Sequence, residues 1–133
     1  MPLYRHTIKS SSRCELLDIA AVIAGDLKKA GVQDGTCIVF VPHTTAAVTI
    51  NENADPSVKR DILTKLADLI PRRDDYHHLE GNSDAHLKAG LLGFSQTLLV
   101  ADGRLLLGTW QDVYFAEFDG PRTRTYYVKI IAE

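Results

Sequence analysis

The sequence predicts an α+β fold, a single compact domain in which a largely antiparallel β-sheet, or sheets, packs with two or three helices. Apolar residues recur at helical spacing in the first two-thirds of the chain, between segments that alternate like strands. The last third is composed of strand-like runs separated by turn residues, which predicts two hairpins. Because strands and helices do not alternate throughout, this pattern argues against a doubly wound fold.

The first half of the chain contains three predicted strands and one helix. In order, they are a strand over 3–9, a helix from Leu16 to Leu27, a continuous apolar strand over 36–41 and a strand over 46–50. Two lysines at 28 and 29 favour the C-terminal end of that helix, and Gly31 ends it. The apolar strand is predicted to be central in its sheet, because such runs are buried on both faces.

The second half contains two predicted helices followed by the two hairpins. Asp55 is expected to cap a helix with Pro56 as its first residue, and Pro71 ends that helix. Asp84 is expected to cap a helix over 86–92 and to pair with Lys88 four residues later. The hairpins are predicted to join 95–100 with 104–108, and 111–118 with 123–131.

The bulk composition narrows the class of protein. The chain has 133 residues, of which 45% are hydrophobic and 24% charged, as in an ordinary single globular domain. The formal charge is −2, so the chain lacks the excess of positive charge that nucleic-acid-binding proteins need, and we expect no nucleic-acid partner. No apolar run approaches the roughly 20 residues of a membrane span, and residues 1–6 do not resemble a signal peptide. We therefore expect a cytoplasmic protein with no membrane partner, in which Cys14 and Cys37 are reduced and buried.

One stretch, residues 77–89, concentrates polar chemistry. It holds three of the five histidines, two carboxylates, an amide and a lysine within thirteen residues. Such side chains are usually exposed unless they have partners, so the stretch is either a solvated loop or a site. Residues 42–45 and 108–111 also place polar side chains where a strand would favour apolar ones. Similar polar residues thus depart from the expected apolar pattern in several separate segments, which favours a shared site.

The histidines of these segments are candidate metal ligands: His43, His77, His78 and His86. Three neutral imidazoles suit zinc or another late divalent metal, with one position left open for water or substrate. Glu80 and Asp84 are candidates for a fourth ligand, for orienting the imidazoles or for a general base. The spacing alone is weak evidence for a metal site, because it is not that of a His-Glu-x-x-His pair on one helix face. The alternative is that two of the histidines only form local hydrogen bonds.

Other polar residues are candidates for binding a phosphorylated substrate. Arg122 and Arg124, two apart on a predicted strand, would share one face and clamp a phosphate, or else lie on a solvated edge strand. Trp110 would either stack on an aromatic ring or belong to the core. Neutral groups suited to phosphate or other substrate oxygens are Thr44, Thr45, Asn51 and Gln111.

Several of these segments together resemble the YjbQ-like family, once catalogued as an uncharacterised protein family. The segments are 95–113 with its Gly-Thr-Trp-Gln ending, 42–47, 51–53, the His77/Glu80-Gly81/His86/Lys88 pattern and 120–124. The resemblance covers essentially the whole chain, 1–133. It implies a YjbQ-like α+β fold and a homotrimer with sites near subunit boundaries. It also implies a secondary thiamine-phosphate synthase activity, which joins hydroxymethylpyrimidine diphosphate to thiazole phosphate and expels pyrophosphate.

The resemblance also carries over to particular residues. His43, His77 and His86 match the family's histidine positions, and Glu80 matches its acidic position. Trp110, Gln111 and Arg124 match the later blocks. Many relatives have two more residues between the Glu-Gly pair and the later histidine, so segment 82–85 is shorter here. The choice between His77 and His78 as ligand therefore stays open, and the His-x-x-Glu-Gly spacing favours His77.

The sequence thus predicts a metal-dependent enzyme, with zinc as the expected ion, that acts on a phosphorylated small molecule. In this hypothesis His43, His77 and His86 hold the metal, while Glu80, His77 and His86 take part in catalysis. Thiamine-phosphate synthesis is implied as a secondary activity. The alternatives are a metal-dependent phosphoester hydrolase, a non-catalytic trimer that binds a phosphorylated metabolite, and a structural trimer with a metal at the subunit boundary.

Overall fold

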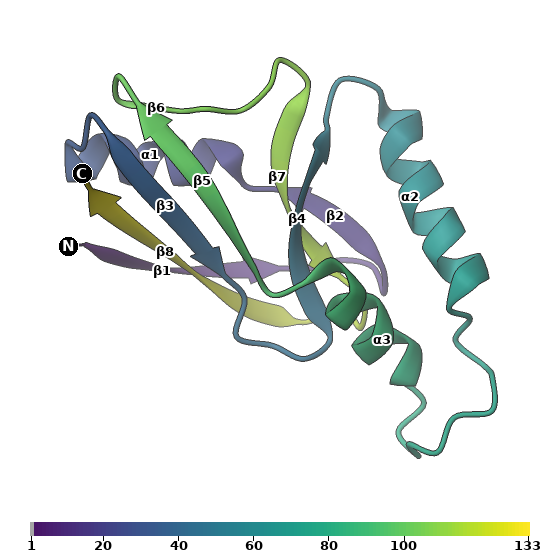
Figure 1. Ribbon diagram of the computed structural model, residues 1–133. Helices are drawn as coiled ribbons and strands as arrows, with labels where there is room; N and C mark the ends of the chain where they lie inside the picture. Colours follow the sequence, from purple (N-terminus) through teal and green to yellow (C-terminus); the bar gives the residue numbers. More distant parts are fainter. Residues whose placement is uncertain (1) are drawn as a thin grey trace.

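The structure of the protein, a computed structural model, describes residues 2–133, so Met1 lies outside the described part of the predicted domain. It is an α+β domain with antiparallel sheets and three helices, which confirms the predicted fold class (Figure 1). The elements are β1 Leu3–Lys9, β2 Glu15–Asp18, α1 Ala20–Ala30, β3 Gly35–Phe40, β4 Ala46–Glu52, α2 Pro56–Leu69, α3 Ser83–Leu92, β5 Ser95–Ala101, β6 Arg104–Leu105, β7 Gln111–Glu117 and β8 Thr123–Ala132.

The strands form two sheets. Five strands pair in the order β1-β8-β3-β5-β6, and three pair in the order β2-β7-β4. Every pairing is antiparallel. β3 lies between β8 and β5, so the prediction of a central apolar strand is confirmed. The helix cap at Asp55 is also confirmed, since its carboxylate accepts a hydrogen bond from the Ser57 backbone N–H at 2.9 Å.

The three-stranded sheet is buried on both faces. On one face Val48 and Phe115 join a core that includes α1 and the inner side of the five-stranded sheet. On the other face Ala47 and Tyr114 pack in a second cluster with residues of α2 and α3. This arrangement explains the apolar run over 113–116 within β7, because neither side of that part of the strand faces water. It also holds α3 against β4 of the small sheet (Figure 1).

The first helix forms, with its lysines in the last turn and its end at Gly31 as predicted, but it begins only at Ala20. The predicted start of this helix and the pairing of the second hairpin were wrong, and non-local pairing explains both. Leu16 and Leu17 do not begin a helix; they belong to β2, where they pair with Ala116 and Phe115 of β7. The predicted second hairpin does not form either, because β7 pairs with β2 and β4 whereas β8 pairs with β1 and β3. The connection over 118–122 therefore crosses from one sheet to the other, through a cis peptide bond between Gly120 and Pro121.

Smaller predictions have mixed outcomes. Asn82, not Asp84, occupies the N-cap position of α3, because that helix already begins at Ser83. The β5–β6 hairpin forms, but its second strand spans only two residues. Both cysteines are free; Cys37 is buried and Cys14 is partly exposed. Among residues 2–133 no helix combines the length and apolarity needed to cross a membrane.

Candidate functional site

A polar pocket of about 460 Å³ opens where four segments meet: the β3–β4 connection, the loop before α3, the start of α3 and the β7–β8 connection. Its lining consists of Pro42, His43, Thr44, Thr45, His78, Glu80, Asn82, His86, Asp119, Arg122 and Arg124. Most of the residues that the sequence singled out therefore come together. They come together because strands of both sheets end at this side of the domain.

The floor of the pocket is a buried ion pair. The Nε of Arg124 donates to both carboxylate oxygens of Glu117, at 2.9 and 3.1 Å, and its Nη2 donates to Thr45 Oγ1 at 2.9 Å. Ser10 Oγ donates to the same carboxylate at 2.7 Å. Burial alone would raise the pKa of Glu117, but the hydrogen bonds from Arg124 and Ser10 outweigh it and hold the pKa below its usual value. The Arg124 charge is thus largely balanced within the floor.

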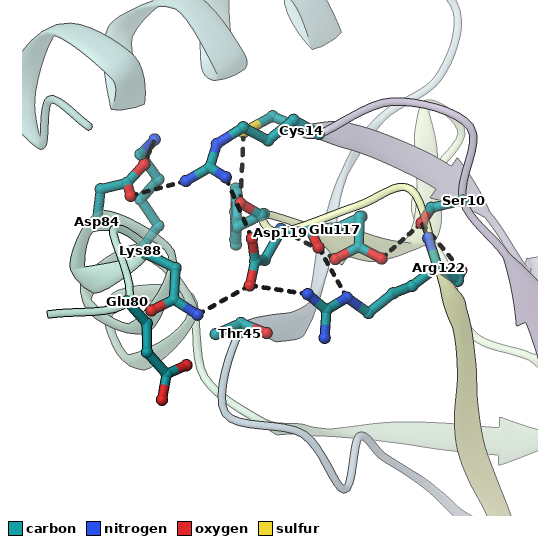
Figure 2. A network of polar contacts seen from close by, with 12 residues as sticks. Ser10, Cys14, Thr45, Glu80, Asp84, Lys88, Glu117, Asp119 and Arg122 are labelled. Atoms are coloured by element: carbon teal, nitrogen blue, oxygen red, sulfur yellow. Dashed lines mark hydrogen bonds and ion pairs between the residues drawn. The ribbon is translucent and has the colours of Figure 1, made fainter. Parts of the chain in front are cut away.

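Arg122 occupies the wall of the pocket and is held from one side. Its Nε donates to the Asp119 carbonyl at 2.8 Å, and its Nη2 donates to Asp119 Oδ2 at 3.1 Å. The Asp119 carboxylate also accepts from Arg13 at 3.1 Å and from Asn82 at 2.9 Å. Figure 2 shows Asp119 at the centre of this group, between Arg122 and the start of α3. The Arg122 side chain remains 51% exposed, so its other N–H groups are accessible to a ligand.

A second set of charges fixes α3 to the rest of the domain. The predicted pair of Asp84 and Lys88 is confirmed at 3.0 Å, and both side chains are almost fully buried. Arg13 joins them to the pocket, because its Nη2 donates to Asp84 at 2.9 Å while its Nη1 bonds to Asp119. Buried charges of this kind persist only when they are paired. Figure 2 shows Asp84 and Lys88 of α3 within this network. By fixing α3, the network sets where that helix presents His86 to the pocket.

His43 is held as a neutral imidazole. The backbone N–H of Thr125 donates to His43 Nε2 at 2.9 Å, which requires a lone pair on that nitrogen and places the ring proton on Nδ1. Burial, and then the nearby positive charge of Arg124, lower the pKa of His43 below its usual value. His43 can consequently donate a hydrogen bond from Nδ1 into the pocket without carrying charge at neutral pH.

We expect this state of His43 to be visible by NMR. Because its pKa in the folded protein is lowered, His43 should stay neutral below pH 6.5, the approximate pKa of a free histidine. The unfolded chain takes up that proton first, so the His43 contribution to stability should be lost as the pH falls below that value. Nitrogen-15 correlation spectra should show the Nδ1–H tautomer, with His43→Asn used to assign the signal. An Nε2–H tautomer would contradict the hydrogen bond from Thr125.

The remaining pocket histidines come from the segment before and within α3. The rings of His78 and His86 meet edge to face, with centroids 5.4 Å apart. His78 Nε2 lies 3.8 Å from Glu80 Oε2, and the Glu80 side chain is 75% exposed. Glu80 points away from the Asp119 group in Figure 2. His77, which the spacing favoured as ligand, lines only an adjoining cavity, together with Tyr76, His78 and His86 among others.

The predicted metal triad does not fit this arrangement. His77 does not line the pocket that contains His43 and His86, and the Nε2 lone pair of His43 is already engaged by Thr125. Throughout residues 2–133, no three or more histidine, cysteine or acidic side chains are grouped closely enough to hold a metal ion. His78, His86 and Glu80 are the pocket residues whose chemistry is closest to that of a metal site.

Three predicted substrate-binding residues lie elsewhere. Asn51 and Gln111 belong to the far ends of β4 and β7, whereas the pocket adjoins the end where Ala46 pairs with Glu117. Five to six strand residues separate the two ends, a distance of about 20 Å. Trp110 is 61% exposed, so it is not part of the core and does not line the pocket. Within one chain, these residues cannot contact the same small ligand as Arg122.

Four polar partners within the site were missed from the sequence: Arg13, Asn82, Glu117 and Asp119. Glu117 carried a signal, because a carboxylate inside the apolar run of β7 needs a buried partner. Asp119 precedes Gly120 and Pro121, a run that is typical of a turn, so its sequence context gives no sign of a role in a site. Arg13 had no recognisable pattern, since its role depends on contacts 71 and 106 residues away along the chain.

Comparisons with known proteins give the chain a family but no activity. Residues 4–133 match the family model described as UPF0047 protein YjbQ-like. The chain is 55% identical over 131 residues to UPF0047 protein MJ1081 of Methanocaldococcus jannaschii, covering 98% of this chain and 95% of the relative. It is 47% identical over 125 residues to UPF0047 protein YugU of Bacillus subtilis, covering 93% and 95% of the two chains.

The solved structures agree with this assignment. An uncharacterised conserved protein of the YjbQ/UPF0047 family from Clostridium acetobutylicum superposes with a TM-score of 0.95 at 51% identity, covering 96% of this chain and 99% of that one. A hypothetical protein from Aeropyrum pernix gives a TM-score of 0.95 at 37% identity, with both chains fully covered. None of these four names states an activity. By its sequence and its fold, the chain belongs to the UPF0047, or YjbQ-like, family.

Proposed function

We propose that this protein is an enzyme that acts on a phosphorylated small molecule and binds the phosphate beside Arg122. One observation carries the proposal: Asp119 holds the Arg122 guanidinium at the pocket while half of the side chain stays exposed. A guanidinium fixed in this way is pre-oriented for paired hydrogen bonds to phosphate oxygens. Because the Arg122 side chain is already ordered in the free protein, ligand binding causes little further loss of its conformational entropy.

Neutral donors around Arg122 support the same ligand class. Thr44 is exposed at the pocket, and Thr45 accepts from Arg124, so the hydroxyl proton of Thr45 is available to a second acceptor. His43 adds an N–H donor from its Nδ1. Arg124 is balanced by Glu117 and supports the floor. Arg122 pairs with Asp119, but Arg122, Arg13 and Lys88 together share only two carboxylates, those of Asp84 and Asp119, so this group keeps a net positive charge beside the phosphate. These groups complement a phosphate or diphosphate better than a neutral substrate.

His86 and His78 are the proposed acid–base groups. Both line the pocket beside Arg122, and neither accepts a backbone hydrogen bond at a ring nitrogen, as His43 does at Nε2. Glu80 lies close enough to His78 to orient it or to take up a proton. In the thiamine-phosphate synthase reaction implied by the family resemblance, the lone pair of the thiazole nitrogen forms the new bond to the pyrimidine methylene carbon as the bond from that carbon to the diphosphate oxygen breaks. His78 or His86 would give a proton to the departing pyrophosphate, and Arg122 would stabilise its charge.

A metal-dependent form of this function, including phosphoester hydrolysis, is the second candidate. It is favoured only by the presence of His78, His86 and Glu80 in one pocket, and it requires them to draw closer together than they are here. The metal content of the purified protein separates the candidates. About one ion per chain supports the metal-dependent form, and no bound ion after incubation with zinc supports acid–base chemistry by the histidines alone.

We also propose that the protein assembles as a homotrimer, as the family resemblance implies. The outer face of the five-stranded sheet supports self-association, because it exposes large apolar side chains from four strands: Leu3, Phe40, Leu99 and Ile131. Light scattering on the purified protein would give a mass of three chains, and a monomeric mass would exclude the trimer.

The phosphate site can be tested with Arg122→Met. Pyrophosphate affinity, measured by calorimetry, should fall about 10- to 100-fold, because a charged hydrogen-bonding partner is lost. Arg104→Met removes the same charge from exposed β6 and should leave the affinity unchanged. Both variants should melt within a few degrees of the wild type. If wild-type protein binds neither phosphate nor pyrophosphate at millimolar concentration, or if both variants bind equally, the proposal fails.

A further inference from the structure

A second cavity of about 330 Å³ adjoins the phosphate pocket and shares two residues with it. His78 and His86 line both cavities. The second cavity is completed mainly by Tyr76, His77 and Leu87, with Asp75 and Ser83 also contributing. Within the described part of the chain, no arginine or lysine lines it, in contrast to the first pocket, which contains two arginines. The two cavities therefore differ in chemistry although they meet at the same pair of imidazole rings.

The second cavity has the character of a ring-binding site. Tyr76, His77, His78 and His86 offer aromatic rings, and Leu87 offers an apolar side chain that is half exposed on α3. Tyr76 is fixed in place, because its hydroxyl donates to the Pro71 carbonyl at 2.5 Å. A leucine held half exposed beside aromatic rings loses contact with water when a flat apolar group covers it.

We infer that the ring of a phosphorylated substrate occupies this second cavity while its phosphate lies beside Arg122. This inference rests on the proposed phosphate site and adds the residues that bind the rest of the ligand. It also assigns the ring contact to residues of 76–87 in place of the distant Trp110.

The shared histidines give this placement a chemical consequence. A ligand that fills both cavities passes between them, so the atoms linking its ring to its phosphate lie beside His78 and His86. The rings of those residues meet at 5.4 Å between centroids, which places two imidazoles at the same linkage. Groups in such a position can exchange a proton with the linking atoms, whereas a phosphate bound alone would leave the second cavity unused.

The test compares two probes that differ only in the ring: phenyl phosphate and methyl phosphate. Calorimetry on the intact wild-type protein should show phenyl phosphate binding at least about tenfold more tightly, from the apolar area that the ring buries. Leu87→Asn should reduce that preference about fivefold and leave methyl phosphate affinity unchanged. Leu91→Asn is the matched control, since Leu91 is 66% exposed on the same helix and does not line the cavity.

The outcomes separate this inference from the proposed function. Equal affinity for the two probes, with Arg122→Met still weakening both, would overturn the ring site and leave the phosphate site standing. Equal losses of phenyl phosphate affinity in Leu87→Asn and Leu91→Asn would overturn the assigned location. Failure of wild-type protein to bind either probe would overturn the phosphate site and this inference together.

Discussion

Replacing Glu117 by glutamine is expected to lower the free energy of unfolding by about 3–5 kcal/mol, the usual cost of breaking a buried ion pair from one side. Glu117 is fully buried and the Arg124 side chain is 4% exposed, so the arginine would keep its charge without a counter-charge and without water. Glutamine has nearly the same shape as glutamate. The decrease in the free energy of unfolding would therefore reflect the lost charge more than any change in packing.

A double-mutant cycle isolates this effect. Glu117→Met and Arg124→Met each leave one buried charge unpaired, whereas the double variant leaves none. We expect the double variant to be more stable than the sum of the single changes predicts, because an apolar pair of similar volume avoids the cost of an isolated charge. Chemical denaturation gives all four free energies. Additive losses would show that Arg124 finds compensation elsewhere and that the ion pair does not govern the pocket floor.

The same pair predicts the direction of the pH dependence. The pKa of Glu117 in the folded protein is held below its usual value of about 4.5, so the unfolded chain binds a proton more readily. Its contribution to stability is present above that pH and should be lost as the pH falls through the lowered pKa. Between pH 7 and pH 3, the free energy of unfolding should fall more steeply with decreasing pH for the wild type than for Glu117→Gln, because glutamine takes up no proton at this position.

The sequence predicted the site better than it predicted the strand pairing. Polar residues that follow apolar runs, such as His43 and Thr45, or that cluster before or within the first turns of a helix, such as Glu80 and His86, do line one pocket. They were recognisable because each departs from the local pattern of a strand or helix. The buried pair of Asp84 and Lys88 was likewise visible, since a spacing of four residues is local information.

What the sequence could not supply depends on distant contacts. The runs containing Tyr114 and Tyr126 look like the two arms of a hairpin, yet they enter different sheets because each finds better partners far along the chain. The same holds for Arg13, whose partners Asp84 and Asp119 come from other elements. Similarly, the spacing of His77 and Glu80 matched the family pattern, but only the path of the loop places His78 in the polar pocket with His86.

Replacing His86 by alanine is expected to lower turnover about 10²- to 10⁴-fold, the range that a positioned general acid or base contributes. The fold should survive, because His86 is only partly buried and alanine is the residue that a helix tolerates best. Pyrophosphate release from hydroxymethylpyrimidine diphosphate and thiazole phosphate is one assay, and hydrolysis of phenyl phosphate is a second. Circular dichroism and light scattering show whether fold and assembly are kept.

The neighbouring histidines make the experiment decisive. His78 shares the polar pocket and meets the His86 ring, so His78→Ala should cause a loss of similar size. His77 lines only the second cavity, so His77→Ala should weaken substrate binding more than turnover. The reverse order, with turnover lost in His77→Ala and kept in His78→Ala, would restore the assignment that the sequence spacing favoured. If His86→Ala instead abolishes assembly and lowers the melting temperature, the histidines have a structural role at a subunit boundary, and the catalytic proposal fails.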